Sequence, residues 1–352
     1  MVVSIQRASY ADIDIDTLVA PFGGFRGMIS SGDRVVLKVN LLNASTPDSA
    51  VVTHPTIVGA VARAVLDVGG IPVIGDSPSG LFSERRLKAV YKSSGLDKVA
   101  RETGAELNWD TRVKTVNVKD GKRLKKTQVC SFIAEADTVV ALPKLKAHSF
   151  MIMTLAMKIM YGAIPGLMKA RYHSQNMRRE TFADMLVDLL PVVPADLYIM
   201  DGVVGMHREG PSGGDPVDIG VMMASVDPVA MDVSVCAMLG VEPVGIPVLK
   251  RAKIRGFWPE TISYPLLSPD DVRFEGFELP STAGHLLSGK KTPAKYPVIL
   301  KNCVACRQCE EICPVSAIVI PDDRAVVEYA KCIRCYCCHE VCPYRAIALE
   351  KR

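Results

Sequence analysis

The segment VVLKV at residues 35–39 is short, apolar and β-branched, and it predicts a buried strand. Residues 54–70, HPTIVGAVARAVLDVGG, place apolar side chains at helical spacing, and Pro55 suits the first helical position. The glycine pair ends this helix, and IPVIG at residues 71–75 predicts the next strand. A strand, a helix and a strand with short connections form a βαβ unit, which implies a parallel sheet.

The alternation of strands and helices continues along the chain to about residue 256. Residues 1–256 are therefore predicted to form an α/β body around a mainly parallel, doubly wound sheet. Six prolines and little periodicity identify residues 257–297 as a tail and linker, which leaves residues 298–352 as a small separate domain. Further strands are expected at residues 137–142, 197–200 and 217–224, and further helices at residues 84–93, 96–103, 149–161, 178–190 and 227–239.

The composition is that of an ordinary globular protein, with 49% apolar residues, 23% charged residues and a net charge of +4. This charge is too small to indicate nucleic-acid binding, and no basic run is interleaved with aromatic residues. The N-terminus has no apolar segment of signal-peptide length. The longest apolar run, residues 150–168, contains Lys158 and Pro165, which favours a buried helix over a membrane span.

Eight of the eleven cysteines occupy matching positions in two runs, CVACRQCEEICP at residues 303–314 and CIRCYCCHEVCP at residues 332–343. Each run has the spacing C-x2-C-x2-C-x3-C-P, in which three cysteines bind one [4Fe–4S] cluster and the fourth binds the other cluster. Structural zinc sites also use C-x2-C pairs. Such a site needs four ligands, usually as two pairs, and a doubled run of three cysteines plus one does not match that arrangement. The predicted ligands are Cys303, Cys306, Cys309 and Cys342 for the first cluster and Cys332, Cys335, Cys338 and Cys313 for the second.

The two runs are halves of an internal repeat that resembles the two-cluster ferredoxins of bacteria. This resemblance implies a small α+β ferredoxin-like domain in residues 298–352 that carries single electrons. Cysteines used in this way indicate a reducing cytoplasm rather than a disulfide framework. No ligand role is predicted for the other three: Cys130 and Cys236 are expected to pack as small apolar residues, and Cys337 lies off the ligand spacing.

Polar residues follow several of the predicted strands, and a doubly wound sheet binds its ligands beyond the carboxyl ends of its strands. In PKLKAH at residues 143–148 the cationic side chains alternate, so an extended backbone directs them to one side. Lys158 lies among apolar residues and needs a partner or a lowered pKa, unless it reaches solvent or a structural carboxylate. The predicted pocket for a small anionic ligand contains Lys38, Asn40, Asp76, Ser77, Lys144, Lys146, His148, Lys158, Arg171, His173 and Asp201.

The segment DGVVGMHREGPSGGD at residues 201–215 holds five glycines. They indicate either a close approach of the backbone to a ligand or a flap that closes over it. The chain has neither the G-x-G-x-x-G fingerprint nor a Walker lysine motif, so nucleotide binding by those routes is not supported. Whether the pocket also binds a flavin or an additional metal is a question that the sequence leaves open.

An ordered set of short motifs runs through residues 30–250. They are Lys38-x-Asn40, Thr53-His54-Pro55, Gly75-Asp76-Ser77-Pro78, Pro143-Lys144-x-Lys146-x-His148, Thr154-Leu155-Ala156-x-Lys158, Ile164-Pro165-Gly166, Asp201-Gly202, Gly210-Pro211 and Asp227-Pro228-Val229-Ala230-x-Asp232. As a set they resemble the domain of unknown function 362, whose members often carry a ferredoxin tail. The chain departs from that family at Val39, where proline is usual, and at Ile159, where asparagine is usual. The resemblance implies no particular reaction.

Together these features predict a cytoplasmic, oxygen-sensitive iron–sulfur oxidoreductase that exchanges electrons with a redox partner protein and passes them to the anionic ligand. In this hypothesis Lys146 and Lys158 hold the anion, His148 donates a proton, and Asp76 or Asp201 orients the cations. Two other interpretations stay open. One is an electron carrier or partner subunit without its own substrate, and the other is a maturation protein that delivers a cluster or reduces a metal centre elsewhere.

Overall fold

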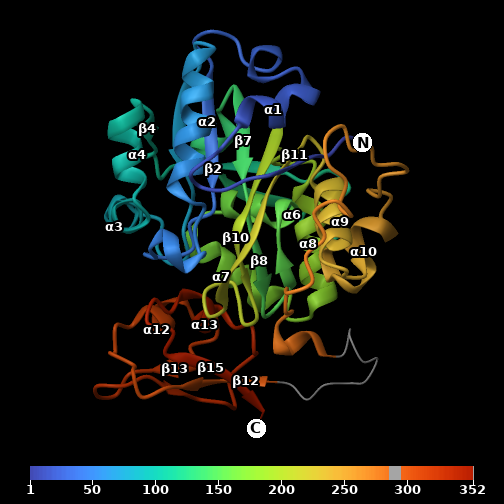
Figure 1. The fold of residues 1–352 in the computed structure, drawn as a ribbon. Coiled ribbons are helices and arrows are strands. Elements are labelled where there is room, and N and C mark those ends of the chain that lie inside the picture. The colour runs from blue at the N-terminus through green and yellow to red at the C-terminus, as the bar shows by residue number, and fades with distance from the viewer. Residues whose placement is uncertain (285–294, 352) are drawn as a thin grey trace.

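The computed structural model describes residues 1–284 and 295–351. At its centre is a sheet with the strand order β1-β11-β10-β7-β2-β3-β4 (Figure 1). The strands from β10 to β4 are parallel, as the βαβ pattern predicts, whereas β1 and β11 add an antiparallel edge that was not predicted. The strands are β1 (Ser4–Arg7), β2 (Arg34–Val39), β3 (Ile71–Gly75), β4 (Glu106–Leu107), β7 (Thr138–Leu142), β10 (Leu197–His207) and β11 (Asp215–Ser225), with β8 (Lys144–His148) and β9 (Ile152–Thr154) attached beside β10.

Helices cover both faces of the sheet, and the side chains of β2 show how. Val35 and Leu37 pack into a core with α1 and α2, whereas Val36, between them, packs into the core of α6, α8, α9 and α10. In Figure 1 these two groups of helices lie on opposite sides of the sheet. The helices of the body are α1 (Ile15–Val19), α2 (Pro55–Asp67), α3 (Glu84–Ser94), α4 (Leu96–Thr103), α5 (Ser131–Ala134), α6 (Ala156–Ile159), α7 (Gly166–Gln175), α8 (Arg179–Leu189), α9 (Pro228–Met238) and α10 (Pro247–Ile254).

The glycine-rich segment 201–215 does not form the predicted flap. β10 continues through it as far as His207, which pairs with Asp215 of β11, and the pairing is interrupted by a register shift between Gly202 and Val204. The glycines inside β10 allow close packing instead, because a Cβ on Gly205 would lie 2.6 Å from the side chain of Ile219. Asp201 is consequently a mid-strand residue and not the last residue of a strand.

The predicted helix at residues 149–161 is also wrong. Thr154 pairs with Lys146 across β8 and β9, so the first part of this segment is a strand. The second part is the one-turn helix α6, whose first amides, those of Ala156 and Met157, donate to the carboxylate of Asp232 at 2.8 and 3.1 Å. Helix α7 follows, in a segment for which the sequence predicted no helix.

Residues 295–351 form a small α+β tail below the body in Figure 1. Its strand β12 begins at Lys295, inside the predicted linker, because it pairs with the last strand of the chain. Helices α12 and α13 occupy equivalent places in the two cysteine runs. The elements are β12 (Lys295–Ile299), α12 (Gln308–Ile312), β13 (Ile318–Val319), β14 (Val326–Val327), α13 (Cys337–Val341) and β15 (Ile347–Lys351), and a separate hairpin of the body is β5 (Val113–Asn117) with β6 (Lys126–Cys130).

The side of the body that receives the tail is the one at which the parallel strands end, and hydrogen bonds join the two parts. Ser212 donates to the backbone carbonyl of Glu340 at 2.9 Å, and Arg345 donates to the carbonyl of Ser212 at 3.2 Å. The His339 ring lies 3.0 Å from the carbonyl of Glu209. Within the described residues, no helix is both long enough and apolar enough to span a membrane.

Candidate functional site

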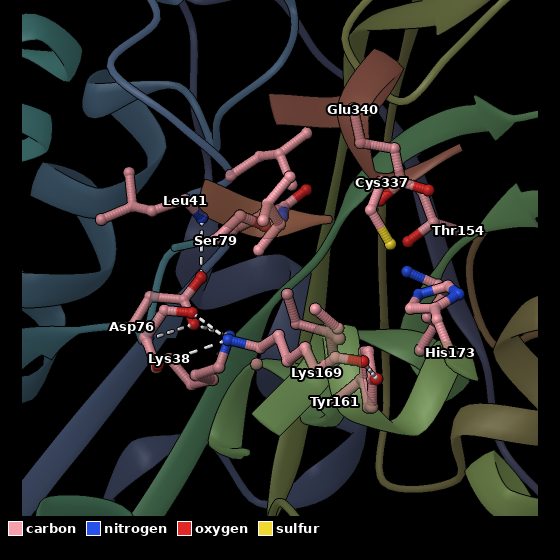
Figure 2. Close-up of a pocket in the computed structure, with 18 residues that line it drawn as sticks. Lys38, Leu41, Asp76, Ser79, Thr154, Tyr161, Lys169, His173, Cys337 and Glu340 are labelled. Atoms are coloured by element: carbon pink, nitrogen blue, oxygen red, sulfur yellow. Dashed lines mark hydrogen bonds and ion pairs between the residues drawn. The ribbon is translucent and has the colours of Figure 1, made fainter. Parts of the chain in front are cut away.

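A pocket lies between the body and the tail, beyond the carboxyl ends of β2 and β3 (Figure 2). The body contributes the segments that follow these strands together with α6 and α7, and the tail contributes α12 and α13. This position is the one expected for a ligand of a doubly wound sheet. We call it the junction pocket. Of the predicted residues, it contains Lys38, Asn40, Asp76, Ser77, Lys158 and His173.

A buried ion pair fixes one side of the junction pocket. The ammonium of Lys38 lies 2.8 Å from Asp76, and both side chains are almost fully buried. The Asp76 carboxylate also accepts hydrogen bonds from the backbone amides of Leu41 and Ser77, each at 2.7 Å. Because Asp76 is held by three donors, its carboxylate fixes the position of the Lys38 ammonium, whereas the predicted anion clamp was Lys146 with Lys158.

Lys158 is another cation that lines the pocket. It lies near the end of α6, and its ammonium is 5.6 Å from the centre of the Tyr161 ring, close enough for a cation–π contact. Within the described residues it has no hydrogen-bond acceptor and no ion-pair partner within 4 Å. Burial lowers the pKa of Lys158, and the nearby carboxylate of Glu340 opposes that shift. An anion bound here would complete its coordination.

A third cation of the pocket, Lys169, was not predicted from the sequence. It reaches from α7 to Ser77, donating to the backbone carbonyl and to the hydroxyl, the latter at 3.3 Å. Burial lowers the pKa of Lys169 to about 8, and Asp76 opposes the shift. Helical spacing places Lys169 one turn before His173, so recognising α7 would have found it. Arg171, which was predicted instead, is exposed and lies outside the junction pocket.

His173 lines the pocket as a neutral side chain. Its ring stacks on Phe182 with a centroid distance of 4.2 Å, and only 3% of the residue is exposed. Burial, together with the charge of Lys158, lowers the pKa of His173 to about 3. Its Nδ1 atom has no hydrogen-bond partner within the described residues, which leaves it available to a ligand.

The three alternating residues of β8, which are Lys144, Lys146 and His148, do not line the junction pocket. Lys144 is paired with Asp201 at 2.7 Å and with the hydroxyl of Tyr10 at 2.8 Å, in a buried polar cluster. Lys146 donates to the carbonyl of Val51 at 2.7 Å. Burial, together with the charges of Lys158 and Lys144, lowers the pKa of Lys146 to about 7. Lys144 and Asp201 therefore stabilise one another, and neither reaches the junction pocket.

His148 lies one contact away from the pocket, behind Glu340. Its Nδ1 accepts from the amides of Phe150 and Met151 at 3.1 and 3.3 Å, so the proton of the neutral ring is on Nε2. This Nε2 atom is 3.4 Å from the Glu340 carboxylate, which lines the pocket. The predicted proton donor can thus reach a ligand only through a residue of the tail.

The tail places two side chains in the junction pocket, Cys337 and Glu340, and neither was predicted there (Figure 2). Both belong to α13, which is buried against the body. Glu340 faces the pocket while its backbone carbonyl accepts the hydrogen bond from Ser212. The sequence gives no signal for either, because a residue of the tail can be assigned to this pocket only when the docking of the tail is known.

The tail brings cysteines of the two runs close to one another. One cavity is lined by all four predicted ligands of the first cluster, Cys303, Cys306, Cys309 and Cys342. Burial raises the pKa of Cys338, and the other predicted ligands of the second cluster, together with Cys309, add to the shift. Thiols this close cannot all ionise unless bound metal neutralises them. Backbone amides donate to two sulfurs, Ala317 to Cys313 at 3.1 Å and Ala346 to Cys342 at 3.3 Å.

In the described part of the chain, no group of three or more His, Cys, Asp or Glu side chains is placed to hold a single metal ion. A four-iron cluster requires a different arrangement of ligands, because each thiolate binds its own iron and the four ligands surround the space that the cluster fills. The cavity between Cys303, Cys306, Cys309 and Cys342 fits that demand.

The chain is similar to several known proteins, among them one relative in sequence and two solved structures. The chain is 32% identical over 270 residues to Thylakoid-associated protein sll1697 of Synechocystis sp., a match that covers 75% of this chain and 81% of that protein. Lactate racemase apoprotein from Thermoanaerobacterium thermosaccharolyticum matches with a TM-score of 0.38 and 12% identity over 64% of this chain and 54% of that chain. A protein from Thermotoga maritima matches with a TM-score of 0.35 and 10% identity over 60% and 55%. The chain spans about half the length of these two structures.

The model of one protein family matches residues 35–237, which is more than half of the chain. The match includes most of the body and ends inside α9, so it covers the body side of the junction pocket and none of the tail. The chain therefore belongs to the family described as domain of unknown function DUF362.

Proposed function

We propose that this protein is an iron–sulfur oxidoreductase that binds two [4Fe–4S] clusters in its tail and a small anionic ligand in the junction pocket. The clusters would supply single electrons, received from a redox partner protein. The observation that carries the proposal is the composition of the pocket. Residues of the second cysteine run, Cys337 and Glu340, face the same space as the body cations Lys38, Lys158 and Lys169.

The side chains of the pocket have separate tasks in this proposal. Lys158 and Lys169 bind the anion, and the Lys38–Asp76 pair holds one end of the site rigid. The pocket contains three ammonium groups and the two carboxylates of Asp76 and Glu340, so its net charge is positive. A positive pocket favours a negatively charged ligand. The neutral ring of His148 would orient the Glu340 carboxylate through its Nε2–H group.

The proposal is tested by native mass spectrometry and by iron and sulfide analysis on protein prepared without oxygen. We expect about eight irons per chain, as two four-iron clusters require. The same mass spectrum would show a retained anion or flavin. Full iron content with no bound anion, and no binding of sulfate as an anion probe, would favour a plain electron carrier or a maturation protein over an oxidoreductase.

Replacing Cys338 with serine is expected to reduce the iron content from about eight to about four per chain. Cys338 is a predicted ligand of the second cluster only, so the first cluster should remain. Cys130→Ser is the matched control, because that thiol is buried in the body core and distant from the tail cysteines in sequence. Equal iron content in the two variants would contradict the ligand assignment.

Sulfate binding is expected to weaken as the pH rises through about 8, the pKa of Lys169. Below this pH the ammonium is charged and attracts the anion, and above it the attraction is lost. Sulfate keeps its own charge throughout, so the pH step reports on the protein. Equilibrium dialysis between pH 6 and pH 10 would measure it. In Lys169→Met the binding should be weak at every pH, and a persisting step near 8 would assign the titration to another group.

A further inference from the structure

The junction pocket has two ends of different chemistry (Figure 2). At one end the ammonium of Lys38 pairs with the Asp76 carboxylate at 2.8 Å. The other end is formed by Thr154, His173 and Glu340, which lie together in Figure 2. A ligand that fills the pocket therefore meets cations at one end, and a hydroxyl group, a neutral ring and a carboxylate at the other.

The second end contains buried polar atoms that lack good partners. The Nδ1 atom of His173 has no hydrogen-bond partner within the described residues, although only 3% of the residue is exposed. One carboxylate oxygen of Glu340 is also buried, and it lies 3.4 Å from Nε2 of His148, a distance too long for a strong hydrogen bond. A buried acceptor without a good donor is costly, so this end favours a ligand that brings a donor of its own.

Size and charge narrow the class of ligand further. The cavity has a volume of about 70 Å³. A water molecule needs roughly 10–15 Å³ by the same measure, so the ligand has about five to seven non-hydrogen atoms. Three ammonium groups against two carboxylates leave one positive charge in excess, which a single negative charge on the ligand balances. The donor that meets Glu340 is therefore uncharged, because an ammonium group would cancel the negative charge of the ligand.

We propose that the ligand of the junction pocket is a small hydroxycarboxylate, whose carboxylate binds Lys158 and Lys169 and whose hydroxyl group donates to Glu340. This inference rests on the proposed function and names the chemical class of its ligand. The hydroxyl oxygen also accepts a hydrogen bond from His173 when the ring proton is on Nδ1. Acetate and sulfate have no such hydroxyl group, so they leave the Glu340 end of the pocket without a donor.

The test is equilibrium dialysis of the anaerobic full-length protein with glycolate, acetate and glycine at neutral pH. Glycolate carries a hydroxyl group next to its carboxylate, and acetate is the same ion without it. We expect glycolate to bind about tenfold more tightly than acetate, because one hydrogen bond to a charged group has that effect on affinity. Glycine, whose ammonium cancels its charge, should bind no better than acetate. Tighter binding of glycine or of hydrogen phosphate than of glycolate would overturn the inference.

Glu340→Gln and Glu311→Gln are a matched pair of variants. Glu311 holds in the first cysteine run the position that Glu340 holds in the second, but it does not line the junction pocket. Glu340→Gln removes a negative charge, so sulfate should bind more tightly. The preference for glycolate over acetate should fall, because a neutral acceptor makes a weaker hydrogen bond than a carboxylate. Glu311→Gln should leave all these affinities unchanged.

His173→Phe keeps an aromatic ring and removes the ring nitrogens, so it should also lower the preference for glycolate while sulfate binding stays unchanged. This variant decides the question if Glu340→Gln does not fold. The inference is overturned if wild type binds glycolate and acetate equally while still binding sulfate, or if the preference for glycolate survives in both variants. Absence of sulfate binding in wild type would instead contradict the proposed function.

Discussion

Replacing Asp201 with alanine is expected to lower the free energy of unfolding by about 3–5 kcal/mol, because it leaves a buried charge without its partner. Asp201 and Lys144 are both fully buried, with 2.7 Å between the ammonium and the carboxylate. The same carboxylate accepts from the hydroxyl of Tyr10 at 3.1 Å and from the amide of His54 at 2.9 Å. Alanine therefore removes the acceptor of three donors at once.

Denaturant unfolding would measure this loss, and Asp215→Ala is a suitable control. Asp215 pairs with Arg208 at 3.0 Å, but both side chains are about half exposed. Such exposed pairs contribute about 0–1 kcal/mol. The loss in Asp201→Ala should also shrink at high pH. Burial lowers the pKa of Lys144 and Asp201 opposes the shift, so without Asp201 the lysine can lose its proton more easily.

Equal stability of the two variants would mean that Lys144 does not depend on Asp201 for its charge. The result also bears on the function. Asp201 was predicted to act in catalysis, but it lies outside the junction pocket. We therefore expect the fraction of the Asp201→Ala protein that remains folded to bind sulfate with the affinity of the wild type.

The parts of the fold that the sequence predicts are those set by local patterns. The strand at Val35, the helix that starts at Pro55 and the strand at Ile71 follow from apolar periodicity and from the proline and glycines at the ends. The helix α9 follows in the same way, with Asp227 accepting from two of its first amides. None of these elements depends on distant residues for its identification.

The elements that the sequence does not predict depend on distant partners. The apolar segment at residues 150–168 has helical periodicity, but its first half pairs with β8, and α6 is capped by Asp232 from α9. β10 extends past its glycines because β11 pairs with it. Tertiary pairing overrides local propensity in both cases.

The junction pocket shows the same division. Lys38 and Asp76 are predictable, because they lie at the ends of neighbouring parallel strands. The contact between His148 and Glu340 is not predictable, because it joins residues of the body and the tail that are far apart in the chain. The pocket is thus a property of the docked tail, which no local pattern encodes.

Replacing Gly162 with alanine is expected to disrupt the junction pocket through a single methyl group. A Cβ at this position would lie 2.5 Å from the Asp76 carboxylate and would also collide with the ammonium of Lys38. These two side chains form a buried ion pair and cannot swing into solvent. We expect a loss of up to about 3 kcal/mol in stability, the range for an overfilled core.

Sulfate binding should weaken by about tenfold or more in Gly162→Ala. Displacing the Lys38–Asp76 pair needs to cost only about 1.4 kcal/mol of binding free energy to lower the affinity tenfold. Gly245→Ala is the matched control. Both glycines lie in short 3₁₀ turns, but a Cβ at Gly245 would have no atom within 4 Å. Unfolding curves and equilibrium dialysis on the two variants would measure both effects. Wild-type sulfate affinity in Gly162→Ala would show that the anion does not depend on the Lys38–Asp76 pair, and would move the binding site away from this end of the pocket.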